Sequence, residues 1–213
     1  MQISRIVFLI LISVFLLNSC SPVKGLKKTS YDKPLSTNNS VLSQHYNTAL
    51  YKAGIAIFDN YYSGLFFIKN IQDKKMANIV FMSEFGLSFM DMKFENNAIQ
   101  TNNVQEFLNR KAIISNMENF FLALFMDISE INNTDIFVDD TNAIKVIKFK
   151  QNSSRYYYFC NQDNKIERII QKKRGRAKLE ISLKYNNEEL PSEIKFENKR
   201  IKLRMELELV RLN

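Results

Sequence analysis

Apolar and polar residues alternate along two long stretches in the last quarter of the chain. The stretch 177–185 has the sequence AKLEISLKY, and the stretch 200–209 has the sequence RIKLRMELEL. A period of two places successive side chains on opposite faces of a β-strand. Both stretches therefore predict strands of an antiparallel sheet with one apolar face and one solvated face. Shorter runs, bounded by turn residues, predict further strands at 52–58, 63–69, 77–83, 87–95, 98–104, 143–150, 155–160, 165–172 and 193–197.

The period changes in the middle of the chain. Between residues 109 and 125 the apolar positions are three and four residues apart, which predicts a helix with one broad, aromatic face. Asn109 is the expected N-cap. The apolar face packs on the sheet as a core helix or lines a lipid-binding cavity, and the two roles are compatible. Its residues are Ile113, Met117, Phe120, Phe121 and Leu124.

These elements predict a mainly β fold with helices (α+β). We expect a strongly curved antiparallel sheet, or an incomplete β-barrel, of about 10–11 strands covered by the central helix, because a sheet this large must curl and its apolar face must be buried. A short helix is also expected at 40–50. Between residues 65 and 94 both faces of the strands are apolar, which indicates either a thick core or a second face that contacts a membrane or a partner.

The first 20 residues have the pattern of an export signal. An apolar run, Ile6 to Leu17, with Ser13 as its one polar residue, follows a basic residue and precedes Asn18, Ser19 and Cys20. The run is shorter than the roughly 20 residues of a membrane-spanning helix. It resembles a bacterial lipoprotein signal, in which a Leu and small residues precede a Cys that receives lipid. Leu17, Ser19 and Cys20 match that pattern, and Asn18 departs from it.

The domain organisation follows from this signal. We expect a signal peptide at 1–19, a lipid-modified N-terminus at Cys20 with a flexible linker over 20–48, and a single domain at 49–213. Removing residues 1–19 removes one basic residue, so the remaining chain carries a net charge of about +7. An exported, lipid-anchored protein rarely encounters nucleic acid, so we do not expect nucleic acid as a partner despite the positive charge. The densest basic cluster, Lys172–Arg176, predicts a solvated turn or, alternatively, a contact with lipid headgroups or phosphate.

Residues for catalysis or metal binding are scarce. Once Cys20 is acylated, Cys160 has no partner for a disulfide. The only histidine is His45, so neither a nucleophile–histidine pair in the folded domain nor a zinc site is predicted. We expect no enzyme activity, no metal and no cofactor, with a carboxylate-dependent hydrolase as the weakest alternative.

The order of lipid anchor, linker, strand meander, central helix and second meander resembles the LolA/LolB family of outer-membrane lipoprotein sorting. The resemblance covers residues 50–209. It implies a half-barrel that encloses an apolar cavity lidded by helices. A LolB-like protein would carry an apolar residue on a protruding hairpin, and Phe85 lies at such a turn, although it could equally be part of the core. The implied cavity residues are the five of the helix face together with Leu65, Phe67, Leu87, Phe89, Leu179, Ile181, Leu203, Met205 and Leu207.

The function implied is that of a lipid-anchored envelope protein that binds acyl chains and receives or inserts lipoproteins at the outer membrane. The expected partners are lipid or lipoprotein acyl chains and a soluble periplasmic carrier. The protein is expected to be a monomer on the periplasmic side of the outer membrane. Acyl chains suit such a site because burial contributes about 0.8 kcal/mol per CH₂, and Met, Leu and Phe adapt to their shape. The alternative is a non-enzymatic structural or assembly lipoprotein of an envelope complex.

Overall fold

The computed structural model describes residues 21–29, 40–42, 46–71, 75–141, 143–186, 189–198 and 200–213. Within these residues there is one α-helix, α2 (Lys111–Phe125), and two 3-10 helices, η2 (Glu106–Leu108) and η3 (Ile128–Glu130). The remaining elements are strands: β1 (Lys27–Thr29), β2 (Thr48–Ile57), β3 (Asn60–Ile71), β4 (Met76–Met82), β5 (Ser88–Glu95), β6 (Ala98–Val104), β7 (Asp135–Val138), β8 (Lys145–Gln151), β9 (Ser154–Cys160), β10 (Ile166–Lys173), β11 (Arg176–Lys184), β12 (Glu193–Asn198) and β13 (Leu203–Leu212).

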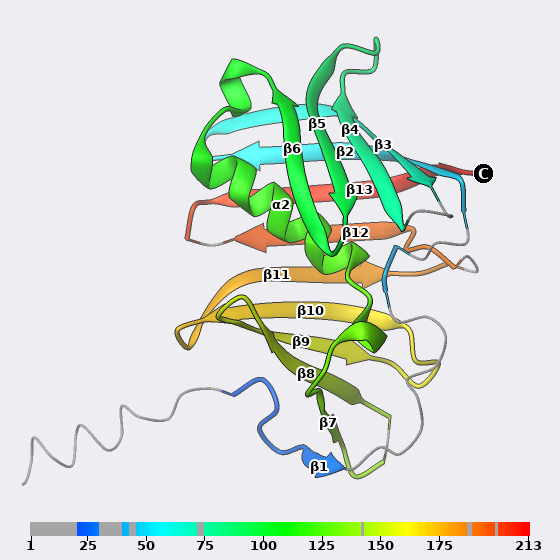
Figure 1. Cartoon of the computed structure of the whole chain (residues 1–213), viewed down its shortest axis with the longest axis vertical. Helices are drawn as coiled ribbons and strands as arrows, with labels where there is room; N and C mark the ends of the chain where they lie inside the picture. Colours follow the sequence, from blue (N-terminus) through cyan, green and yellow to red (C-terminus); the bar gives the residue numbers. More distant parts are fainter. Residues whose placement is uncertain are drawn as a thin grey trace, which may run out of the picture.

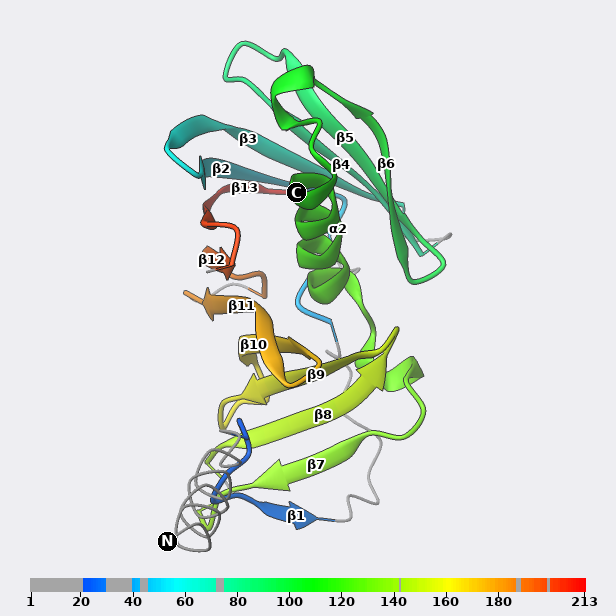
Figure 2. The same ribbon diagram turned by 90° about the vertical axis from the view of Figure 1, so that its left-hand side faces the viewer.

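All 13 strands of the described residues belong to one antiparallel sheet, in the order β1-β7-β8-β9-β10-β11-β12-β13-β2-β3-β4-β5-β6. Two meanders, β2–β6 and β7–β13, join where the last strand pairs with β2. The backbone of Asn213 exchanges hydrogen bonds with Thr48, at 2.9 and 3.0 Å, which closes this seam. The sheet curves strongly, and α2 lies inside the curve (Figures 1 and 2).

This architecture confirms the mainly β prediction and the covering helix. Each of the 11 predicted strands corresponds to an observed strand, and two short strands, β1 and β7, were not predicted. The described sheet therefore has 13 strands instead of about 10–11. β1 lies inside the range expected to be a linker and pairs with β7, so residues 27–29 are part of the sheet.

Two local predictions were wrong. The helix begins at Lys111 with Arg110 as its N-cap, and Asn109 instead ends η2. The helix expected at 40–50 is not present over that range, because residues 48–50 start β2, where Ala49 faces the core and pairs with Ile68. The strand prevails because pairing with β3 satisfies the backbone of these residues. His45 lies outside the described residues.

The main core lies between the inner face of the sheet and α2. Aromatic side chains connect them. The ring of Phe121 meets Phe66 of β3 at 5.1 Å between centroids, and that of Phe120 meets Phe196 of β12 at 5.3 Å. These contacts hold the helix against strands from both meanders, so α2 closes the curve of the sheet.

A second, smaller apolar cluster lies on the opposite face of β8–β10. Its buried residues are Val146, Tyr157 and Ile170. Val23 and Leu26, which precede β1, pack against it, together with Phe137 and Phe159. The residues around Val23 and Leu26 are therefore held on the outer face of the sheet, next to β1 at its edge.

Candidate functional site

The interior between the sheet and α2 contains most of the residues predicted to form a lipid cavity. Ten of them belong to the main core, and each side chain is at most 2% exposed. Phe89 is half-buried against the same core. The inner face of the sheet is thus continuous with the apolar face of α2. The ten buried candidates are Ile113, Met117, Phe120, Phe121, Leu124, Leu179, Ile181, Leu203, Met205 and Leu207.

Three cavity candidates lie outside this interior. Leu65 and Phe67 alternate with Phe66 and therefore point to the outer face of β3, where both are half-buried. Leu87 lies in the loop between β4 and β5 and is 69% exposed. For these three residues the predicted interior placement was wrong, because an apolar run along both faces of a strand does not identify which face meets the helix.

The β4–β5 loop presents an exposed aromatic residue. The side chain of Phe85 is 95% exposed, so it does not belong to the core. The Ser83 hydroxyl accepts hydrogen bonds from the backbone N–H groups of Phe85 (3.3 Å) and Leu87 (3.1 Å). Gly86, with φ of 83°, completes the turn. This loop projects beyond the end of the sheet farthest from β1 (Figure 1).

Polar contacts join α2 to three strands. The Tyr158 hydroxyl of β9 donates to the carbonyl oxygen of Ala123 at 2.8 Å. This carbonyl is in the last turn of the helix, where carbonyl groups have no partner within the helix. Burial raises the pKa of Tyr158 well above its ordinary value, so the hydroxyl keeps its proton and remains a donor. The other two contacts are Asn198 Nδ2 to Asn116 Oδ1 (2.6 Å) and Thr101 Oγ1 to Glu118 Oε1 (2.9 Å).

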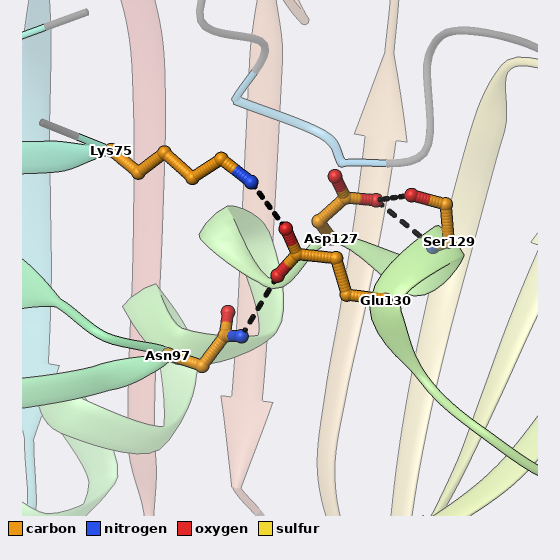
Figure 3. Close-up of polar contacts among 5 residues, drawn as sticks. All are labelled: Lys75, Asn97, Asp127, Ser129 and Glu130. Atoms are coloured by element: carbon orange, nitrogen blue, oxygen red, sulfur yellow. Dashed lines mark hydrogen bonds and ion pairs between the residues drawn. The ribbon is translucent and has the colours of Figure 1, made fainter. Parts of the chain in front are cut away.

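A cleft of about 240 Å³ opens beside the C-terminal end of α2. The rings of Phe94 and Phe125, stacked at 5.1 Å, line it together with polar residues. Figure 3 shows the polar group: Glu130 of η3 accepts from the Lys75 ammonium group and from Asn97 Nδ2, the latter at 3.2 Å. Glu130 therefore links the β3–β4 turn and the β5–β6 turn across this cleft.

These contacts determine the charge state of the carboxyl groups at the cleft. The hydrogen bond from Lys75, followed by that from Asn97, lowers the pKa of Glu130. Asp127 accepts from the backbone N–H (2.9 Å) and the hydroxyl (2.6 Å) of Ser129, which fixes the start of η3. The carboxylates here act in structural contacts that hold loops together.

Among the described residues, no group of three His, Cys, Asp or Glu side chains is placed to hold a metal ion. Burial raises the pKa of the Cys160 thiol to about 11, which keeps it protonated at neutral pH. In the described part of the chain, no helix has the length and apolar character to cross a bilayer. Cys20, the predicted lipid attachment site, lies outside the described residues.

The sequence patterns did not reveal the side chains that hold α2 against the sheet or those that join the loops around the cleft. Tyr158 lies within an aromatic run that predicts only a strand. Lys75 and Asn97 are in two hairpin turns and Glu130 is in η3, and the fold brings these three segments together. No local pattern signals such contacts, because each depends on segments distant in sequence.

No family model matches the sequence, and no curated protein matches it. The solved structure of a LolA superfamily protein from Nitrosomonas europaea aligns with a TM-score of 0.55 at 10% identity, over 83% of this chain and 88% of that one. A DUF1329 family protein from Desulfovibrio piger aligns with a TM-score of 0.46 at 11% identity, over 79% and 86%. A Vibrio parahaemolyticus domain described as outer membrane lipoprotein-sorting has a TM-score of 0.43 at 7% identity, over 78% and 85%. At such identities the likeness to the Nitrosomonas protein concerns the fold, and this chain has a LolA-like fold.

Proposed function

We propose that the protein binds acyl chains between its curved sheet and α2, and that it receives or inserts lipoproteins at the outer membrane as a lipid-anchored envelope protein. One observation carries the proposal: a continuous apolar inner face, rich in Phe, Leu, Ile and Met, is closed by α2 on a LolA-like fold. Acyl chains need such a surface because they make no specific polar contacts.

Acyl binding requires α2 to shift. The side chains of the inner face pack against one another, and Met117, Phe120 and Phe121 are fully buried. An acyl chain would take the place of these helix residues on the sheet. The cleft beside Phe94 and Phe125 is the proposed point of access, because apolar rings are reached there behind a polar rim.

Uptake of a fluorescent fatty-acyl probe by the delipidated full chain tests this proposal. We expect saturable fluorescence enhancement that unlabelled acylated peptide competes away. Absence of uptake at probe concentrations that load a bona fide lipid carrier would contradict acyl binding. Urea unfolding measured on the same sample checks that the protein is folded.

The anchor is proposed to be lipid on Cys20. Cys20→Ala removes the thiol to which lipid attaches, and the several acyl chains of a lipoprotein cysteine hold far more firmly than a single chain. We expect the variant to lose mature-size, membrane-associated protein while its domain remains folded. Fractionation with gel mobility measures this. If the processed Cys20→Ala variant remained attached to the membrane, lipid on Cys20 could not be the anchor.

The alternative, a non-enzymatic assembly lipoprotein, is favoured by a different surface. The outer face of β2–β4 carries half-buried apolar side chains at paired positions, with Leu50 opposite Phe67 and Leu65 opposite Met82. Such a patch suits a protein partner. A packed interior that takes up no acyl probe, together with a stable complex lost in Phe67→Ser, would favour this alternative.

Phe85 is proposed as the residue that enters a bilayer or contacts the carrier. Its ring is the most exposed large apolar side chain of the described residues, and the Ser83 contacts hold its loop in a defined shape. An exposed aromatic side chain on a fixed loop gains free energy when a bilayer or an apolar partner surface covers it.

A further inference from the structure

A second cleft lies at the tip of the β10–β11 hairpin. Its volume is about 950 Å³, and its lining residues are Lys173, Arg174, Arg176, Ala177, Lys178 and Arg200. Five of these six residues are cations, and none is a carboxylate. Arg200 comes from the β12–β13 turn, so two neighbouring turns of the sheet supply the charge. Figure 1 shows both turns on the same side of the molecule.

The cations of this cleft lack the ion pairs that neighbouring cations form. Lys184 and Lys195 both contact Glu193, at 2.9 and 2.7 Å, and Arg168 contacts Glu180. Within the described residues, by contrast, the five cleft cations form no ion pair, and four of the five are exposed. An unneutralised cluster of this kind attracts anions.

The hairpin holds these charges in a defined arrangement. Arg174 and Gly175 both have positive φ, at 51° and 80°, as a tight two-residue hairpin turn requires. A register shift between Gln171 and Lys172 marks a bulge just before the turn, and such bulges re-aim the side chains that follow. Arginine suits phosphate because its planar fork donates two parallel hydrogen bonds to a pair of oxygens.

The cleft lies close to the segment that follows Cys20. Val23 and Leu26 pack against the cluster that contains Ile170, which precedes Lys173 by three residues on the same strand. Cys20 precedes Val23 by three residues in the sequence, and three residues span at most about 11 Å. Figures 1 and 2 both show the blue segment 21–26 on the side of the sheet that carries the β10–β11 turn. A lipid on Cys20 would therefore bring the bilayer surface next to the basic turn.

We propose that this basic cleft binds the phosphate headgroups of anionic phospholipids in the bilayer that holds the Cys20 lipid. The placement of the bilayer rests on the proposed anchor, whereas the preference for anionic headgroups rests on the cleft itself. Docking of the hairpin fixes the orientation of the domain on the membrane. The anchor alone would leave the domain free to rotate.

The test uses the absence of tryptophan from the chain. Ala177→Trp places a single tryptophan on the wall of the cleft, and dansyl-labelled headgroups report its proximity by energy transfer when the tryptophan is excited selectively over the tyrosines. The full chain is reconstituted in phosphatidylcholine vesicles with or without 30 mol% phosphatidylglycerol, a proportion of about one third chosen to give a strong surface potential. We expect greater energy transfer with the anionic vesicles, and we expect high salt to abolish the difference.

Two variants in this background decide the outcome. Lys173→Gln, Arg174→Gln and Arg176→Gln together should reduce the ratio of docked to undocked protein by about a hundredfold, since each cation near an anionic surface contributes about a factor of five. Lys52→Gln, Lys69→Gln and Arg211→Gln remove the same charge from exposed strand positions away from the hairpin and should leave the anionic preference unchanged.

Equal losses in the two triple variants, or a hairpin variant that keeps the preference, would overturn the proposal. An unchanged urea midpoint in both variants shows that the fold is intact. Acyl-probe uptake in the same samples separates this proposal from the proposed function. If the probe is not taken up, the preference for anionic vesicles can still be measured. If the anionic preference is absent, uptake of the probe can still be measured.

Discussion

Tyr158→Phe should loosen the closure of α2 over the sheet. The substitution keeps the buried ring and removes the hydroxyl that donates to the Ala123 carbonyl at 2.8 Å. The carbonyl groups of Leu122 and Leu124 have other donors, from Met126 and from Val41 and Leu42. The hydroxyl of Tyr158 is therefore the contact that satisfies the Ala123 carbonyl from outside the helix, and its loss leaves a buried acceptor unpaired.

An unpaired buried polar group costs about 1–3 kcal/mol. If α2 must move to admit an acyl chain, the loss of this hydrogen bond destabilises the closed state relative to the open state by part of this free energy. A difference of 1.4 kcal/mol is tenfold in an equilibrium constant, so we expect acyl-probe uptake to become roughly tenfold faster. Stopped-flow fluorescence measures the uptake rate, and urea unfolding measures the loss of stability.

Tyr156→Phe is the matched control. Its hydroxyl accepts from Gln171 Nε2 at 2.7 Å, so the substitution also leaves one buried polar group unpaired, but the pair lies within the sheet. We expect a similar loss of stability and no change in the uptake rate. Equal uptake rates in both variants, or no acceleration in Tyr158→Phe despite lower stability, would refute the role of α2 as a lid.

Three further outcomes are expected. The fluorescence of Phe85→Trp should be quenched by brominated acyl chains if the loop enters the bilayer, and it should be unaffected if the loop contacts a protein. The carboxylate of Glu130 has a lowered pKa, so its contribution to stability is present above its ordinary value of 4.5 and is lost as the pH falls below it. Glu130→Gln should therefore flatten the acid side of the stability profile measured by urea unfolding. Cys160, with its pKa raised to about 11, should react with a maleimide at pH 8 only after denaturant unfolds the protein, and reaction of the native protein would contradict its burial.

The strands could be predicted from the sequence where one face meets the core and the other meets water. β11 alternates from Lys178 onward and β13 alternates from Leu203 to Leu209, so burial and sequence period agree there. β1 and β7, with three and four residues, are too short to show a period. They exist because each completes the backbone hydrogen bonds of a neighbour, and pairing between distant segments leaves no local signal.

The candidate site could be predicted only in part, for a related reason. The helix face from Ile113 to Leu124 is buried as expected, because a 3.6-residue period identifies one side of a helix. Leu65 and Phe67 of β3 were assigned to the wrong face of the sheet, since a run that is apolar on both faces of a strand has no distinctive period. The basic turn was interpreted first as a solvated hairpin. Its cleft became visible only when the fold placed Arg200 beside it.

The positions of the proposed membrane contacts set a condition on how the protein works. The loop of Phe85 follows β4, which is six places from β10 in the strand order, or about 29 Å along the sheet at 4.8 Å per strand. While Val23 and Leu26 remain packed on the cluster that contains Ile170, a lipid on Cys20 would stay near the basic turn. We expect Phe85, on a different loop, to remain available to a carrier in that state. Release of residues 21–29 would lengthen the tether and let the domain bring Phe85 to the same bilayer, at the cost of exposing the apolar cluster around Tyr157. Quenching of Phe85→Trp that occurs only when segment 21–29 is released would therefore distinguish a cargo-receiving state from a membrane-inserting state.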